Sequence, residues 1–240
     1  MNFTCKQPIS HLSIIGQGDD AIIYDFEGSA VKVFKGTSDD YHYQAFHSEV
    51  VQQLMISKLI KKGKLFANYY SEMIYYLDCC QSNNEQSFCA AIVYPKYKTD
   101  LEKFLLTSTQ TQFNQIKNII STTLTSYVIL YQVTTMIHGH FVYSNILLDE
   151  KNNPIISDFG KMIKKPCIDH VKEFIWFIIQ LRDYANGAKD KINRPWLAQL
   201  IQGPQLIKDC VSLINFFEID QRITDASSKE IQDVFDYWIQ

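Results

Sequence analysis

The sequence has no surplus of positive charge. Acidic side chains number 26 against 23 Lys plus Arg, which gives a formal net charge of −3 at pH 7. Proteins that bind nucleic acids usually present a basic surface, because they neutralise backbone phosphates. Nucleic acid is therefore not an expected partner of this chain.

Long apolar runs are also missing. No stretch approaches the roughly 18 consecutive apolar residues that suggest a membrane-spanning helix. The longest candidate, residues 174–181, covers about two helical turns and predicts a buried helix. Residues 1–10 lack the apolar segment of a signal peptide. We therefore expect no membrane span and a cytoplasmic protein, or one that acts in a host cytosol if it is a secreted effector.

The six cysteines do not form a metal-binding pattern. None has Cys-x-x-Cys spacing, and Cys79 and Cys80 are adjacent, which suits neither a zinc site nor a disulfide framework. We expect free thiols in a reducing cytosol. The sequence also lacks internal repeats and any linker rich in Pro, Gly or Ser.

What is present is the composition of a globular protein, with 46% hydrophobic and 20% charged residues. The first part of the chain predicts strands, at residues 12–15, 21–24, 30–34, 73–77 and 88–94. Between them, residues 41–62 have helical spacing. The apolar side predicted for this helix consists of Val50, Val51, Leu54, Met55, Ser57 and Leu59.

After Pro95 the pattern becomes helical. Helices are predicted from residue 100, over residues 113–137, and over residues 169–240 except for a loop at 186–195 and a turn at 203–204. Short strands are predicted at residues 146–148 and 155–156. Phe174, Trp176 and Phe177 are expected to pack in the core. The fold class is therefore α+β, with a small β-rich part of about residues 1–95 and a helical part of about residues 96–240.

A glycine hairpin lies between the first two predicted strands. Its small residues, Gly16, Gly18 and Ala21, together with Ile23, would let the backbone approach phosphates closely. Taken alone, an ordinary tight turn is the simpler interpretation of these residues. The acidic pair Asp19 and Asp20 would have to point outward at the tip.

The third predicted strand carries Ala30 and Lys32, and the helix that follows carries Glu49. A strand lysine that is partly buried needs a carboxylate partner, because an unpaired ammonium is costly to desolvate. Taken alone, a solvated lysine and an unrelated surface glutamate remain the simpler interpretation. Further motifs decide between the two.

The loop of residues 138–148 supplies that context. Asn145 follows His140 by 5 residues, and Asp158-Phe159-Gly160 begins 18 residues after His140. In this order of hairpin, lysine, glutamate, asparagine and Asp-Phe-Gly, the sequence resembles the protein kinases over nearly its whole length. Further likenesses lie at the hinge-like segment 92–97, at Asp169 before the apolar run, and at residues 220–224.

The resemblance implies a two-lobed kinase-like fold with ATP and Mg²⁺ in the cleft between the lobes. It implies that Lys32 and Glu49 position phosphates, and that Asn145 and Asp158 hold the metal ion. Around adenine it implies Tyr94, Lys96 and Tyr97. The expected nucleotide-contacting residues are therefore Gly16, Gly18, Ala21, Ile23, Ala30, Lys32, Glu49, Tyr94, Lys96, Tyr97 and Asn145. His138 matches a structural histidine of the family, and metal binding by His138 with His140 is the less favoured alternative.

The sequence departs from the family at two places. His140 stands where kinases have the catalytic aspartate, and Val142 stands where they have a lysine. Only residues 161–168 separate Gly160 from Asp169, so the activation segment is nearly absent and contains no Ser, Thr or Tyr. The catalytic residues implied are Lys32, Asp158 and His140, the last in an altered role.

Two classes of function are compatible with this pattern. One is an atypical protein serine/threonine phosphotransferase in which His140 or water replaces the aspartate. The other is a pseudokinase that binds nucleotide and acts as a scaffold or allosteric partner of another protein. Nucleotidyl transfer from ATP is a further alternative, because a fold does not fix its chemistry.

Overall fold

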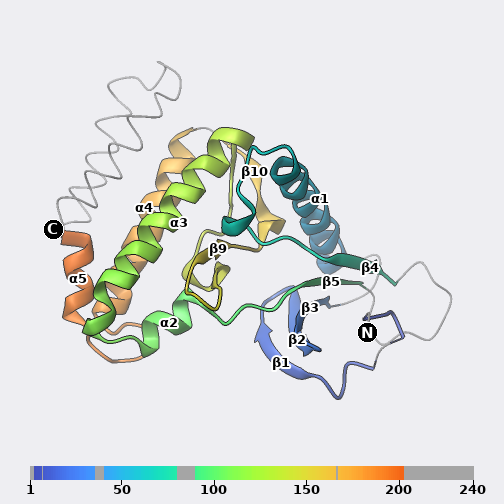
Figure 1. The fold of residues 1–240 in the computed structure, drawn as a ribbon, viewed down its shortest axis with the longest axis horizontal. Helices are drawn as coiled ribbons and strands as arrows, with labels where there is room; N and C mark the ends of the chain where they lie inside the picture. The colour runs from blue at the N-terminus through green and yellow to red at the C-terminus, as the bar shows by residue number, and fades with distance from the viewer. Residues whose placement is uncertain (1–2, 7, 36–40, 80–89, 166, 203–240) are drawn as a thin grey trace. The chain divides into compact units, whose positions relative to one another are not determined.

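The computed structural model describes residues 3–6, 8–35, 41–79, 90–165 and 167–202 (Figure 1). The chain forms two compact units. Unit 1 comprises Met1–Lys98 together with Ser157–Lys161, and unit 2 comprises Thr99–Ile156 together with Met162–Gln240. The segment that carries Asp158 therefore belongs to the same unit as the N-terminal strands.

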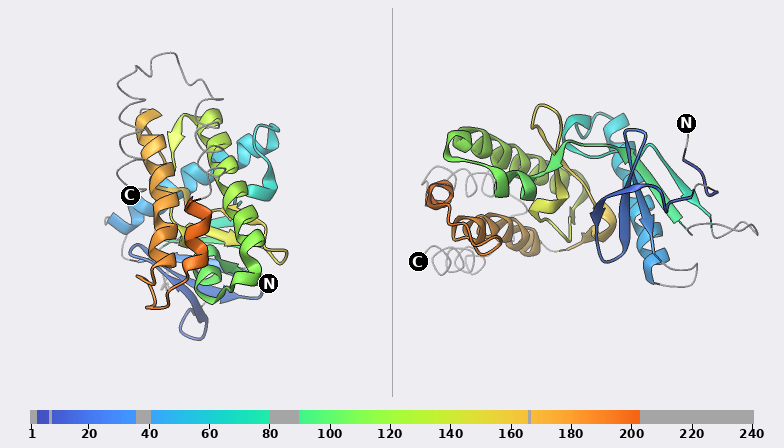
Figure 2. Two further views of the ribbon diagram at one scale, coloured as in Figure 1. Left: turned by 90° about the vertical axis from the view of Figure 1, so that its left-hand side faces the viewer. Right: turned by 90° about the horizontal axis from the view of Figure 1, so that it is seen from below.

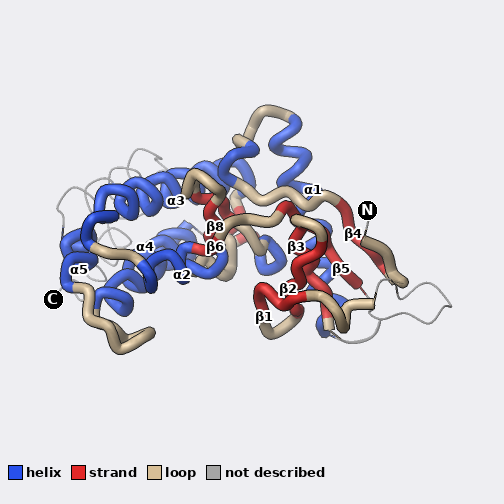
Figure 3. Tube along the Cα trace, turned by 60° about the horizontal axis from the view of Figure 1, so that its bottom comes forward, coloured by secondary structure: helices blue, strands red, loops and turns tan. Residues whose placement is uncertain are grey.

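Unit 1 is built on a five-stranded antiparallel sheet, drawn in red in Figure 3. The strand order is β1-β2-β3-β5-β4, with bounds β1 Ser13–Gln17, β2 Ala21–Phe26, β3 Ser29–Phe34, β4 Tyr75–Asp78 and β5 Ala90–Pro95. Glu27 and Gly28 connect β2 to β3 with φ of 48° and 81°. Positive φ at both central residues is the geometry of a two-residue hairpin turn, and it matches the twist of the strands.

The two faces of this sheet carry different groups. Successive side chains of a strand point to opposite faces. One face packs in a cluster that contains Phe26, Val31 and Val93, while the other packs Phe34 and Ile92 against helix α1 (Tyr41–Lys61). The sheet therefore separates a mainly apolar layer from the layer that contains α1.

The buried side of α1 differs from the one predicted. Its buried residues are Phe46, Glu49, Val50, Gln53 and Ile56. Val51 and Leu54, which the apolar pattern placed inside, are 60% and 50% exposed. The prediction was right for Val50 and wrong for Val51 and Leu54, because it was based mainly on the spacing of apolar residues. The helix is instead rotated so that two polar side chains, Glu49 and Gln53, face the sheet.

A disulfide bond joins Cys5 to Cys79, with Cα atoms 5.6 Å apart. Both sulfurs lie at the apolar face of the sheet, where Cys79 is fully buried. The main chain of Phe3 is also fixed there, because its N–H donates to the Tyr75 hydroxyl at 2.7 Å. The expectation of free thiols was therefore wrong for this pair. Disulfides persist mainly in oxidising surroundings, so cysteine usage no longer supports a reducing cytosol.

Unit 2 is mainly helical, and Figure 2 shows its three longest described helices beside one another. The helices are α2 Leu101–Thr107, α3 Phe113–Thr134, α4 Cys167–Ala185 and α5 Pro195–Gln202. Asp100 caps α2 by accepting the Lys103 N–H at 2.8 Å. Small sheets complete the unit, one of β6 Thr99–Asp100, β8 Ile146–Leu148 and β9 Pro154–Ile156, the other of β7 Met136–Ile137 and β10 Ile163–Lys164.

The predicted mixture of an antiparallel sheet with helices is confirmed as an α+β arrangement. The apolar run at residues 174–181 is part of α4, with Phe174 and Phe177 fully buried. Trp176 is 50% exposed, so its predicted place in the core was wrong. Helical spacing puts it on the opposite side from Phe174. The predictions for residues 203–240 lie outside the described residues, and none of the described helices is long and apolar enough to span a membrane.

Candidate functional site

The strand residues singled out in the sequence lie on one face of the unit 1 sheet. Gly16 pairs with Ile23, Ile23 with Lys32, and Lys32 with Ile92, so these positions form one row across four strands. The neighbouring pair Ala30 and Tyr94 lies two residues away and therefore on the same face. Ala21 belongs to the same face and packs in the cluster beside α1. The sheet therefore places Gly16, Ala21, Ile23, Ala30, Lys32 and Tyr94 on one face, the face that packs against α1 through β3 and β5.

Lys32 is the centre of a three-residue ion cluster. Its Nζ lies 2.6 Å from Oε2 of Glu49 on α1 and 2.7 Å from Oδ1 of Asp158. The Lys32 and Glu49 side chains are 15% and 4% exposed, whereas Asp158 is 35% exposed. The sequence therefore named three residues, 126 positions apart at the extremes, that the fold of unit 1 brings into direct contact.

The electrostatics of the cluster follow from burial and pairing. Burial alone would lower the pKa of Lys32, but the carboxylates of Glu49 and Asp158 more than reverse this and raise it. Burial raises the pKa of Glu49, an effect that the bonds from Lys32 and Tyr94 reduce. The lysine is therefore a fixed cation at neutral pH.

The Asp158-Phe159-Gly160 segment is fixed closely against α1. Ser48 Oγ donates to the Gly160 carbonyl at 2.6 Å, and Phe159 is fully buried. A Cβ atom on Gly160 would lie 3.3 Å from Cβ of Glu49, so the glycine permits this approach. Asp158 itself has a φ of 63°, in the left-handed region that Asp and Asn tolerate better than most residues. Strained backbone of this kind is often found at functional sites.

The glycine hairpin is a tight turn that is fixed by hydrogen bonds, including two from the Lys35 side chain. Gly18 N–H donates to the Ala21 carbonyl at 2.9 Å. Lys35 Nζ donates to the carbonyls of Gly18 and Asp19, each at 2.9 Å. The side chain of Asp19 is exposed, as predicted, while Asp20 lies 3.2 Å from Nδ1 of His42. This network fixes the turn, and Lys35 and His42 are contacts that the sequence interpretation did not identify.

The three hinge-like residues have separate surroundings. Tyr94, near the end of β5, donates its hydroxyl hydrogen to Glu49 Oε1 at 2.6 Å. Lys96 Nζ lies 2.5 Å from Asp25 Oδ2 in a partly exposed pair. Tyr97 is half-buried beyond the strand. Tyr94 therefore contacts the ion cluster directly, through Glu49.

In unit 2, His140 and Asn145 lie together on the loop between β7 and β8. Asn145 Nδ2 donates to the His140 carbonyl at 2.9 Å and lies 3.3 Å from its Nδ1. The His140 side chain is exposed, and that of Asn145 is partly exposed. His138 is fully buried, in keeping with a structural role. His140 and Asn145, both predicted site residues, are therefore in contact within unit 2.

Glu173 is a site residue that the sequence interpretation missed. Its Oε2 accepts the His138 N–H at 3.0 Å and the Tyr127 hydroxyl, and its Oε1 accepts the Phe141 N–H at 3.3 Å. The interpretation had pointed to Asp169, one helical turn earlier, which lies in the first turn of α4. A charged residue beside the apolar run was the available signal, because such a residue needs partners.

The donor set of unit 1 fits a magnesium ion. No three His, Cys, Asp or Glu side chains of the described residues gather into a metal-binding group. Mg²⁺ does not require such a group, because it keeps several waters and uses one or two carboxylates together with phosphate oxygens. Asp158 is a partly exposed carboxylate beside Lys32, whose ammonium can pair with phosphate oxygens. One carboxylate together with phosphate oxygens is a donor set that Mg²⁺ accepts. Asn145, the other predicted ligand, belongs to unit 2, and its role as a metal ligand stays a prediction.

Comparison with known proteins adds no family. Neither a protein-family model nor a curated protein matches the chain. The functional conclusion therefore rests on the residues and their geometry.

Proposed function

We propose that the protein is a kinase-like protein that binds ATP together with Mg²⁺ through unit 1. The observation that carries this proposal is the ion cluster of Lys32 with Glu49 and Asp158. Three residues selected by sequence order alone are in contact, on the sheet face that also carries the glycine hairpin. A chance surface lysine would not explain a nearly buried cation shared by two carboxylates.

Each residue has a defined task in this proposal. Lys32 presents a fixed positive charge to the phosphates, and Glu49 orients its ammonium. Asp158 provides the carboxylate that would hold Mg²⁺, whose charge neutralises the phosphates when it is bound. Gly16 and Gly18 keep the hairpin free of bulky side chains. Ile23 and Ala30 supply small or apolar surface on the same face for adenine, whereas Ala21 is buried in the cluster beside α1 and supports that face from below.

The activity proposed is transfer of a phosphoryl group to a protein, weakened by the loss of the usual base. His140 takes the place of that base, since a neutral imidazole accepts a proton and this residue is exposed on its loop.

The presence of His140 and Val142 in place of Asp and Lys favours a second candidate, a pseudokinase that binds nucleotide as a scaffold. Incubation with γ-labelled and α-labelled ATP separates them. If protein is labelled by the γ-labelled ATP alone, the activity is phosphotransfer. If protein is labelled by the α-labelled ATP, the activity is nucleotidyl transfer. If no protein is labelled, the scaffold is favoured.

The first prediction concerns nucleotide binding. Lys32→Ala removes the cation, and Asp158→Asn removes the carboxylate charge but keeps a residue type that tolerates positive φ. Wild-type protein with ATP and Mg²⁺ at about 100 times the dissociation constant should gain about 2.7 kcal/mol of stability, measured by thermal shift. Both variants should lose most of that gain.

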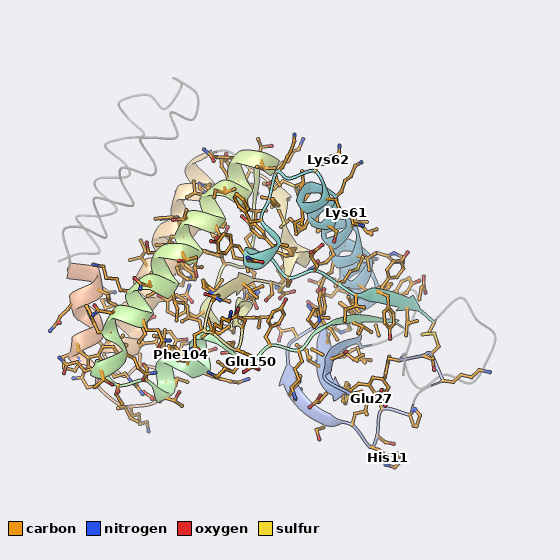
Figure 4. All side chains as sticks on the ribbon, viewed as in Figure 1. His11, Glu27, Lys61, Lys62, Phe104 and Glu150 are labelled. Carbon is orange, nitrogen blue, oxygen red and sulfur yellow. A yellow bond between two sulfur atoms is a disulfide. The ribbon has the colours of Figure 1, made fainter. Side chains whose placement is uncertain are left out.

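Lys61→Ala is the matched control, because Lys61 is an exposed lysine at the end of α1, labelled in Figure 4. It should behave as wild type. Omitting Mg²⁺ should reduce the shift in wild type and have little effect on Asp158→Asn. If wild-type protein shows no shift with ATP and Mg²⁺, the proposed nucleotide binding is wrong.

A further inference from the structure

Tyr94 has a contact that the sequence did not suggest. The sequence predicted it as a residue beside adenine, yet its hydroxyl donates to Glu49 Oε1 at 2.6 Å. The other oxygen of the same carboxylate, Oε2, accepts from Lys32 Nζ at 2.6 Å. One buried carboxylate is thus held at both oxygens, by partners on two different strands.

The register of the sheet explains why the Tyr94 side chain can reach Glu49. Tyr94 pairs with Ala30, and Lys32 pairs with Ile92, so Tyr94 and Lys32 lie on the same face of neighbouring strands. Glu49 points at this face from α1 and is 3% exposed. The tyrosine and the lysine therefore approach the carboxylate from β5 and β3.

A second polar side chain, Gln53, lies one turn after Glu49 on α1 and is also fully buried. Gln53 Nε2 in turn lies 3.5 Å from Ser71 Oγ. The direction of the Tyr94 hydroxyl is therefore set by Glu49, within a buried polar side of α1.

A glutamate bound at only one oxygen can still turn about its side-chain bonds. A second strong bond at the other oxygen removes that freedom and satisfies a buried acceptor that would otherwise be costly. We propose that Tyr94 is a positioning residue, which holds Glu49 in the orientation that binds Lys32. The inference rests on the proposed function only in assigning this pair to nucleotide binding. The bond itself is independent of any ligand.

The test measures how firmly Lys32 is held, without nucleotide. Purified protein is acylated with an N-hydroxysuccinimide acetate at fixed pH, and the rate at Lys32 is followed by peptide mass spectrometry. The exposed Lys61 and Lys62 serve as internal references. Tyr94→Phe removes one oxygen and should accelerate acylation of Lys32 about fivefold, the factor that corresponds to a hydrogen bond of about 1 kcal/mol.

Two further variants separate positioning from general loosening. Glu49→Gln should also accelerate acylation of Lys32, and adding Tyr94→Phe to it should cause no further increase, because Tyr94 acts through Glu49. Tyr75→Phe is the matched control, since it removes a hydroxyl bonded to Phe3 in the same unit. Its Lys32 rate should equal wild type. Urea unfolding of every variant verifies that the compared proteins are folded.

The outcomes distinguish this inference from the proposed function. If Tyr94→Phe leaves the Lys32 rate at the level of Tyr75→Phe, or if its effect multiplies that of Glu49→Gln, Tyr94 does not position Glu49. If Tyr94→Phe weakens binding of ATP with Mg²⁺ without changing the acylation rate, Tyr94 is a lining residue and the inference fails. If wild-type protein binds no ATP but the acylation pattern holds, the proposed function fails and the positioning role stands.

Discussion

His170 of α4 is buried between two aromatic rings of α3. Its ring centroid lies 4.7 Å from that of Tyr127 and 4.0 Å from that of Tyr131, with nearly parallel planes. Among the described residues, neither ring nitrogen of His170 has a hydrogen-bond partner. Burial lowers the pKa of this histidine from 6.5 to about 4, because the charged form would be poorly solvated.

This residue predicts a pH dependence of stability. In the unfolded chain the imidazole takes up a proton near its ordinary pKa of about 6.5, whereas the folded protein resists protonation until about pH 4. Acid therefore favours the unfolded state, and stability should fall as the pH decreases from 7 to 4. The contribution of this one group is at most about 3 kcal/mol.

His170→Phe should remove that contribution while keeping an aromatic ring between the two tyrosines. Urea unfolding of both proteins at several pH values measures the difference in their free energies of unfolding. The difference should change across this pH range and be constant above pH 7.5. Parallel profiles for wild type and variant would show that His170 is not buried in its neutral form.

At the scale of elements, α4 fixes the loop that carries His140. Glu173 accepts main-chain hydrogen atoms of His138 and Phe141 and the hydroxyl hydrogen of Tyr127. Phe141 adds an apolar anchor, with its ring 4.1 Å from Tyr127 and 4.3 Å from Phe177. The loop is therefore joined to two helices of unit 2 at one position.

Glu173→Gln should loosen this loop. An amide has one acceptor oxygen, so at least one of the three donors loses its partner, which costs about 1–3 kcal/mol when the group is buried. Amide hydrogen exchange at His138 and Phe141 should become faster. Tyr127→Phe is the control, because it removes one donor and leaves both main-chain bonds. Unchanged exchange at both amides in Glu173→Gln would mean that the loop is held by its other contacts.

Local patterns predicted most described elements, but not every buried side. The strands at residues 21–24 and 30–34 and the helix at 41–62 correspond to β2, β3 and α1 within a few residues. The buried side of α1 was misjudged because Glu49 and Gln53 face inward. Their inward position depends on Lys32 and Tyr94, which come from other strands. The spacing of apolar residues along a helix does not indicate which polar side chains have partners on other strands.

Contacts between distant residues were predictable only where a motif named both. Lys32, Glu49 and Asp158 were found because their order and spacing resemble a known family. The Cys5–Cys79 bond spans 74 residues and has no such motif, so cysteine spacing gave no indication of it. Glu173 was missed for a related reason. Two of its three partners are main-chain N–H groups, which every residue except proline has and which the sequence therefore does not single out.

For the whole molecule, the two units divide the proposed tasks. The ion cluster and the glycine hairpin belong to unit 1, whereas His140 and Asn145 belong to unit 2. Under the kinase-like proposal, nucleotide affinity depends on the former residues, and acceptance of the substrate proton depends on His140. The two properties should therefore respond to different substitutions.

The last prediction tests this division through His140. Phosphoryl transfer depends mainly on positioning and charge neutralisation, and a general base contributes about 10²–10⁴-fold. His140→Ala should therefore reduce transfer from γ-labelled ATP to protein in a cell extract, without changing nucleotide affinity. His140→Asp should restore or raise transfer. His11→Ala is the control, because His11 is an exposed histidine of unit 1, labelled in Figure 4. If His140→Ala equals wild type while Asp158→Asn is inactive, His140 takes no part in transfer. If wild type, His140→Ala and His140→Asp all transfer nothing although ATP binds, the scaffold is the correct interpretation.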